Sequence, residues 1–229
     1  DKMIVNHNLR KRLKEGFSNV QYEYRAIKKD QTLLYVEILG SRTTYNGKPA
    51  ITGTLLDITD RKKAEEKIEY LAYHDALTGL SNRHQFYTRL KNNLAQETTK
   101  DLAVLFIGLD RFKFINDSLG QEIGDRLIQK VPERLKNCIG IKGNLARNGS
   151  DEFLVSLRNM NRQEVFETAK RILGSFTKPF HVDQYELHTT TSIGISFYPN
   201  DGKDVDTLIK KADAALYQVK RKGKNHYQF

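Results

Sequence analysis

The chain has 229 residues, of which 38% are hydrophobic and 29% charged, so it has enough apolar content for one or two folded domains and too much for a disordered protein. Its formal net charge of +10 favours a polyanionic partner, but aromatic side chains are not interleaved with the basic clusters, which argues against a nucleic-acid binder. The longest apolar run, residues 102–109, is too short to cross a bilayer, and the single Cys138 cannot form an internal disulfide. We expect a cytoplasmic protein, although segments outside this chain could anchor a longer protein to a membrane.

The first part of the chain alternates apolar and polar residues in the manner of β-strands. Turns are expected at residues 29–31 and at Asn46–Gly47, the latter being the strongest two-residue hairpin signal. This pattern predicts an antiparallel β meander within residues 1–60. A helix is expected over residues 61–74, with apolar positions three and four residues apart, as in a linker helix that docks on a neighbour or forms a short coiled coil.

Strands and helices alternate in the remaining residues, 75–229. The periodicity predicts helices over 83–97, 119–138, 162–174 and 204–221, and strands over 102–109, 143–147, 152–158, 176–181, 184–190, 191–198 and 226–229. Because some strands meet through tight turns, we expect an α+β fold, an α/β sandwich in which a mixed or antiparallel central sheet is flanked by helices.

Two adjacent carboxylates, Asp151 and Glu152, follow Gly149 at the tip of a predicted hairpin. Carboxylates are costly to desolvate, so such a pair is consistent with a bound cation and a metal-bound polyphosphate. A solvated acidic turn is the alternative explanation, and these residues by themselves do not decide between the two.

Other polar motifs point to a nucleotide. The strand over 102–109 is followed by a turn whose backbone N–H groups, with Lys113, can hold phosphate oxygens. Asn116 and Asp125 offer an amide and a carboxylate, a pair that can recognise the edge of a guanine. Lys220 and Lys224 are four residues apart near a helix end, where they would lie on one face as point charges for a polyphosphate.

These motifs resemble those of the GGDEF family of diguanylate cyclases over about residues 70–229. The matching segments are Asp-x-Leu-Thr-Gly-Leu-x-Asn-Arg at 75–83, with Ser81 or Asn82 expected to cap a helix, Phe-Lys-x-x-Asn-Asp at 112–117, Gly-Asp at 124–125, the signature at 149–153 and Ala-Asp-x-Ala-Leu-Tyr at 212–217. The preceding part, ending in residues 57–65, resembles the C-terminal half of a PAS domain. The chain is thus similar to a fragment of a bacterial PAS-GGDEF signalling protein, in which an EAL phosphodiesterase domain commonly follows.

The resemblance implies synthesis of cyclic di-GMP from two GTP molecules by a homodimer, with Mg²⁺ or Mn²⁺. By position in the family motifs it implies that Asp151 and the Leu109 backbone bind metal and that Asp151 and Glu152 form the catalytic site. It implies five substrate-binding residues: Asn116, Asp125, Lys113, Lys220 and Lys224.

The sequence also departs from the family pattern. Gly108 stands where the family has a metal-binding aspartate, and Asp110, two residues later, is a poor substitute because it is displaced by roughly 6–7 Å along the strand. Ser150 replaces the second glycine of the signature. Gly140 and Gly143 replace the Arg-x-x-Asp of the family's inhibitory product site, so we expect no product inhibition there.

Three functions remain open from the sequence. The first is a GTP-binding regulatory module whose degenerate metal site makes it weak or inactive as a cyclase, with weakened Mg²⁺ or Mn²⁺ binding. The second is an active diguanylate cyclase in which Asp110, backbone carbonyls or water complete the metal site. The third is a PAS-linked dimerisation scaffold for a downstream EAL domain.

Overall fold

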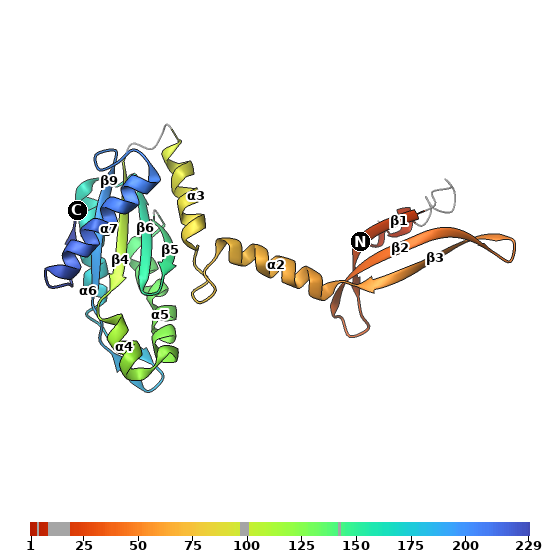
Figure 1. The fold of residues 1–229 in the computed structure, drawn as a ribbon, viewed down its shortest axis with the longest axis horizontal. Coiled ribbons are helices and arrows are strands. Elements are labelled where there is room, and N and C mark those ends of the chain that lie inside the picture. Colours follow the sequence, from red (N-terminus) through yellow and green to blue (C-terminus); the bar gives the residue numbers. More distant parts are fainter. Residues whose placement is uncertain (4, 9–18, 97–100, 142) are drawn as a thin grey trace. The chain divides into compact units, whose positions relative to one another are not determined.

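A computed structural model describes residues 1–3, 5–8, 19–96, 101–141 and 143–229 (Figure 1). The chain divides into two compact units, Asp1–Tyr70 and Leu71–Phe229.

The N-terminal unit contains a three-stranded antiparallel sheet in the order β1-β2-β3. Its elements are β1 (Asn19–Ile27), β2 (Leu33–Tyr45) and β3 (Lys48–Asp57), followed by helix α2 (Thr59–Tyr73). Asn46 and Gly47, which join β2 to β3, have φ values of 49° and 75°, the positive values that a tight two-residue hairpin requires. The predicted meander is therefore present, and the predicted helix begins two residues early.

The C-terminal unit is built on a five-stranded sheet in the order β10-β9-β4-β6-β5. Its helices are α3 (Arg83–Leu94), α4 (Phe112–Leu119), α5 (Gln121–Ile139), α6 (Arg162–Ser175) and α7 (Val205–Arg221). Its strands are β4 (Leu102–Leu109), β5 (Gly143–Gly149), β6 (Glu152–Arg158), β7 (Phe180–Val182), β8 (Tyr185–Leu187), β9 (Thr191–Tyr198) and β10 (Tyr227–Gln228). Strand β10 runs parallel to β9 and the other neighbours in this sheet are antiparallel, which confirms the mixed sheet.

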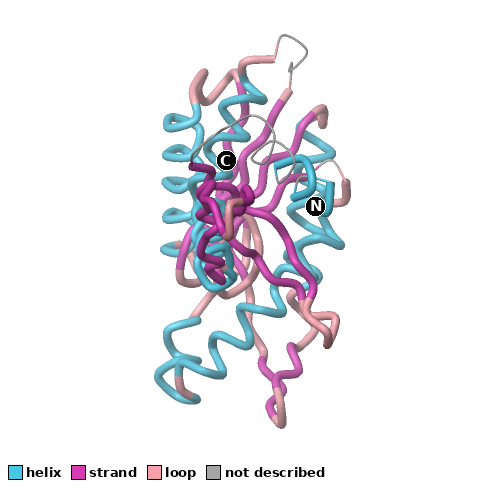
Figure 2. Tube along the Cα trace, turned by 90° about the vertical axis from the view of Figure 1, so that its right-hand side faces the viewer, coloured by secondary structure: helices cyan, strands magenta, loops and turns pink. Residues whose placement is uncertain are grey.

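The central strand β4 is buried on both faces, and its residues alternate between two cores. Leu102, Val104 and Phe106 pack in one core with residues of α3 and α7, whereas Leu105 and Ile107 belong to another core with residues of α5 and α6. In Figure 2, helices accordingly lie on both sides of the strands. This confirms the α+β fold. Within the described residues, no helix has the length and apolar content needed to cross a bilayer.

The structure contains one helix that the sequence pattern did not predict, α4. The helix expected over 119–138 is α5, and it is preceded by α4, from which it is separated at Gly120. Gly120 has a φ of +88°, which lies outside the helical region. Glycine adopts such a positive φ more readily than other residues do. The sequence pattern predicts a turn here, and Asn116-Asp117-Ser118 within α4 are residue types that often form turns.

Candidate functional site

The ends of β4 and of the β5–β6 hairpin lie side by side. In the register of β4 with β6, Gly108 is paired with Glu152, and the Leu109 N–H donates to the Asp151 carbonyl oxygen over 3.1 Å. The structure thus brings together the predicted metal ligands Asp151 and Leu109, the predicted catalytic Glu152, and the glycine that replaces the family's aspartate.

Gly108 faces helix α7, and the side chain of Lys220 reaches over it. A Cβ atom on residue 108 would lie 2.6 Å from Lys220 Nζ and 2.8 Å from its Cε, closer than such atoms approach in proteins. The same Nζ is 3.7 Å from Asp151 Oδ2, so Lys220 and Asp151 form an ion pair. A lysine ammonium therefore lies at the strand end where the family has a metal-binding carboxylate.

Asp110 is not available as a replacement ligand. Its side chain is buried, and its carboxylate accepts hydrogen bonds from Thr190 Oγ1 at 2.6 Å, Ser192 Oγ at 2.7 Å and the Asn225 N–H at 3.1 Å. These bonds join the end of β4 to β9 and to the turn after α7. Asp110 is therefore a structural residue, which agrees with the expectation that it would be a poor substitute.

The hairpin tip between β5 and β6 requires positive φ values. Gly149 has a φ of +145° and Ser150 a φ of +37°. Positive φ is unfavourable for residues other than glycine by roughly 1–2 kcal/mol, so Ser150 carries strain that the signature's usual glycine would not.

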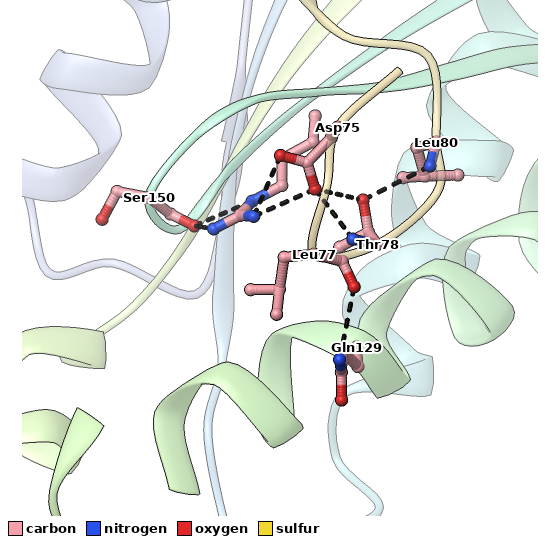
Figure 3. Close-up of polar contacts among 7 residues, drawn as sticks. Asp75, Leu77, Thr78, Leu80, Gln129 and Ser150 are labelled. Carbon is pink, nitrogen blue, oxygen red and sulfur yellow. Dashed lines mark hydrogen bonds and ion pairs between the residues drawn. The ribbon is translucent and has the colours of Figure 1, made fainter. Parts of the chain in front are cut away.

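Arg147 joins this tip to Asp75. Figure 3 labels Asp75, Thr78 and Ser150 and marks their polar contacts with dashed lines. The Arg147 guanidinium donates to the Ser150 carbonyl oxygen at 2.8 Å and to both carboxylate oxygens of Asp75, at 3.0 and 3.1 Å. Burial opposes ionisation of Asp75, but hydrogen bonds from Thr78 and Arg147 outweigh it and hold the pKa of Asp75 below its usual value. Sequence reasoning missed Arg147, because its partner Asp75 is 72 residues away along the chain.

Glu152 lies beside a cavity of about 340 Å³ on the face covered by α3 and α7. Asn148 Nδ2 donates to its Oε2 over 2.9 Å, a contact that the sequence did not reveal. The cavity is lined by Arg83, Tyr87, Phe106, Asn148, Glu152, Asp206, Ile209, Lys210 and Asp213.

The predicted guanine-binding pair is Asn116 on α4 and Asp125 on α5, and Asn116 lies against Gly124, the residue before Asp125. Asn116 Oδ1 is buried without a hydrogen-bond partner and lies against Gly124, where a Cβ atom would overlap it. Asp125, the next residue, is half-buried. Helices α4 and α5 can thus approach closely at this point because residue 124 has no side chain.

Helix α4 begins directly after β4 and the turn residues Asp110 and Arg111. Arg111, at the N-cap, has a φ of +58° and makes no side-chain capping hydrogen bond. The first N–H groups of a helix have no partners within it, so this end of α4 can donate to an anion. Lys113, in the first turn of α4, is exposed.

The two C-terminal lysines do not share a helix. Lys220 lies in the last turn of α7, whereas Lys224 follows the helix, has a φ of +69° and donates its N–H to the Val219 carbonyl oxygen over 3.1 Å. The expectation that both lie on one helix face is therefore wrong, because α7 ends at Arg221. The next residue, Asn225, is nevertheless tied to Asp110, so this turn lies at the end of β4.

GGDEF-type chemistry implies Mg²⁺ or Mn²⁺, and the donors at this site do not fit a pair of such ions. Residue 108 has no side chain, the buried Asp110 carboxylate already accepts three hydrogen bonds within the protein, and Asp151 is paired with Lys220. Among the residues that the structure describes, no three His, Cys, Asp or Glu side chains form a group that could hold a metal ion.

Comparison with known proteins identifies the family of this chain. Residues 72–226 match the family described as "Diguanylate cyclase, GGDEF domain". The signaling protein YkoW of Bacillus subtilis is 39% identical over 177 residues, which are 76% of this chain and 22% of YkoW. The bifunctional diguanylate cyclase/cyclic di-GMP phosphodiesterase MucR of Pseudomonas aeruginosa is 33% identical over 198 residues, 86% of this chain and 28% of MucR.

A solved structure of the GGDEF domain of TpbB (also called YfiN) from Pseudomonas aeruginosa is also similar. It has a TM-score of 0.65 and 35% identity, covering 68% of this chain and 92% of that one. The chain spans about a quarter of the length of YkoW and of MucR. From the match over residues 72–226 and the shared fold, this chain belongs to the GGDEF domain family of cyclic di-GMP signalling.

Proposed function

We propose that the C-terminal unit is a GTP-binding regulatory module that is weak or inactive as a diguanylate cyclase. The observation that carries this proposal is the state of residue 108, where a glycine and the Lys220 ammonium replace the family's metal-binding carboxylate. The residues proposed to bind the nucleotide, among them Asn116, Asp125 and Lys113, are retained.

The lack of a carboxylate at residue 108 should lower the rate of the cyclase reaction more than the affinity for GTP. Magnesium requires near-ideal octahedral geometry, and losing an anionic ligand should reduce transition-state stabilisation by several kcal/mol. Each 1.36 kcal/mol added to the activation free energy lowers the rate tenfold, so this loss corresponds to a reaction that is about a thousandfold slower or more. Guanine recognition depends on hydrogen bonds from other parts of the site and should be affected far less.

An active cyclase would need a different ligand in place of residue 108. Asp110 is the nearest candidate along the strand, and its hydrogen bonds with Thr190 and Ser192 argue against it. The name of the relative MucR includes both cyclase and phosphodiesterase activities. We infer by analogy that the GTP-binding module acts in a longer protein on a phosphodiesterase, as a homodimer.

In this proposal, the PAS-like part and helix α2 transmit a signal to the GTP-binding module. Helix α2 has no buried residues and exposes Ile68 and Leu71, which are apolar and three residues apart. Such a stripe favours pairing with a second copy of the helix. The scaffold alternative rests on this observation.

The experiment is calorimetric titration of the purified chain with GTP, with ATP as the matched control, followed by product analysis after incubation with Mg²⁺ or Mn²⁺. We expect GTP to bind, ATP to bind at least about tenfold more weakly, and GTP to be recovered unconverted. Robust formation of cyclic di-GMP would overturn the claim of impaired catalysis. Absence of GTP binding would overturn the claim of a GTP-binding module.

A further inference from the structure

The side chain of Lys220 uses the space that a side chain at residue 108 would need. Its Nζ and Cε lie 2.6 and 2.8 Å from the position of a Cβ on Gly108. The contact is with the end of a flexible side chain, so a larger residue at 108 can be accommodated if Lys220 swings away. The glycine therefore determines where the ammonium lies without being required for the fold.

Lys220 also balances the charge of Asp151. Its Nζ is 3.7 Å from Asp151 Oδ2, and the two side chains are 31% and 23% exposed. That separation is longer than a charge-assisted hydrogen bond of about 2.7–2.9 Å, and an ammonium has three donors. The pair is thus neutral overall, and Lys220 can still donate to a second anion.

A phosphate at this place would meet positive charge from the protein itself. The N-terminus of α4 begins at the same end of β4, and the turn that carries Lys224 is tied to Asp110 there. Lys220 would offset the repulsion between Asp151 and the phosphate oxygens, which is the task that a divalent cation performs at a carboxylate site.

Building on the proposed GTP-binding function, we propose that the Lys220 ammonium takes the place of the divalent cation, so that this chain binds the triphosphate of GTP without Mg²⁺ or Mn²⁺. Gly108 makes this arrangement possible, because a side chain at that position would displace the ammonium.

The test measures the affinity of a fluorescent GTP analogue in EDTA and in Mg²⁺. The parent protein should bind with affinities that agree within about threefold in the two buffers. In EDTA, Lys220→Met should lose about tenfold or more in affinity. The control Lys211→Met, which removes the same charge from an exposed position of α7, should stay within about twofold of the parent.

Two substitutions at residue 108 distinguish the effect of displacing the Lys220 ammonium from the effect of adding a carboxylate that can bind a metal ion. Gly108→Ala should displace Lys220 and weaken binding about equally in both buffers. Gly108→Asp should displace it as well but add a carboxylate, so its binding should become at least about tenfold tighter in Mg²⁺ than in EDTA. Circular dichroism of both variants checks that they fold.

The experiment distinguishes failure of the inference about Lys220 from failure of the proposed GTP-binding function. If the parent loses about tenfold or more in affinity on removal of Mg²⁺, the inference is overturned while the proposed GTP-binding function stands. If Lys220→Met binds as the parent does in EDTA, Lys220 has no such role. If the parent binds no GTP in either buffer, the proposed function fails, and the inference fails with it.

Discussion

The proposed guanine-binding region and the proposed metal-binding region of the site lie on neighbouring elements, but they depart from the family pattern to different degrees. In the guanine-binding region, Asn116 and Asp125 are retained and Gly124 leaves the room that Asn116 needs. In the metal-binding region, Asp151 remains but is paired with Lys220 over Gly108. Recognition of a base depends on hydrogen bonds that survive one lost carboxylate, whereas a two-metal reaction depends on every anionic ligand. The comparison leads us to expect that GTP binding can persist in this domain when catalysis is lost.

The largest effect is expected at Asp110, which tests whether the remaining strand-end carboxylate is structural. Asp110→Ala leaves Thr190, Ser192 and the Asn225 N–H without their acceptor, at a cost of about 3 kcal/mol. Thermal unfolding should show a midpoint lower by about 6–12 °C.

The control for this substitution is Asp117→Ala, which removes an exposed carboxylate from α4 and should leave the midpoint within about 1 °C. A fully stable Asp110→Ala protein that loses Mg²⁺ binding would show that Asp110 is a metal ligand, and the metal-binding region would be less degenerate than we describe.

The next effect concerns the guanine-binding region. Asp125→Asn replaces an acceptor with a donor at one carboxylate oxygen and should weaken GTP binding by about tenfold to a hundredfold. Xanthosine triphosphate carries a carbonyl where guanine has its amino group, so the variant should bind it better than the parent does. Competition titrations with both nucleotides check this. Unchanged selectivity would remove Asp125 from base recognition.

A smaller, pH-dependent effect is expected from the Asp75–Arg147 ion pair that holds the metal-binding hairpin. Because the folded-state pKa of Asp75 is lowered, its contribution is fully present above the unfolded pKa of about 3.9 and is lost as pH falls through the folded pKa. Asp75→Asn should therefore lower stability at pH 7 and flatten its decline in acid. Urea unfolding at several pH values measures this, and parallel curves for parent and variant would contradict it.

The smallest effect is expected at the hairpin tip. Ser150 has a φ of +37°, so Ser150→Gly should relieve strain and raise the free energy of unfolding by about 0.5–1 kcal/mol. Urea unfolding at pH 7 detects such a change. A less stable variant would mean that the serine side chain contributes an interaction that offsets the strain.

Much of the fold follows from local sequence patterns. The apolar run at 102–109 and the alternation at 152–158 predict β4 and β6 with their observed bounds, because a buried strand needs such runs. Helix α4 was missed, since its Asn116-Asp117-Ser118 stretch resembles a turn until Phe112 and Ile115 are seen to be buried. The local pattern of apolar residues therefore predicts a helix or strand well when its apolar positions follow one another without interruption.

The sequence predicts individual residues of the site but not the contacts between them. The sequence identified Gly108, Asp151 and Lys220 singly, but the placement of the Lys220 ammonium over Gly108 depends on how α7 packs across β4. The ion pair of Arg147 with Asp75 likewise joins residues 72 positions apart. No local periodicity encodes such contacts, because they arise from tertiary packing.

The most direct test of impaired catalysis is product analysis of the purified chain incubated with GTP and Mg²⁺ or Mn²⁺. GTP should remain unconverted under conditions in which calorimetry shows that it is bound. Rapid conversion of the bound GTP to cyclic di-GMP would contradict the account, because it would mean that the site functions without a carboxylate at residue 108.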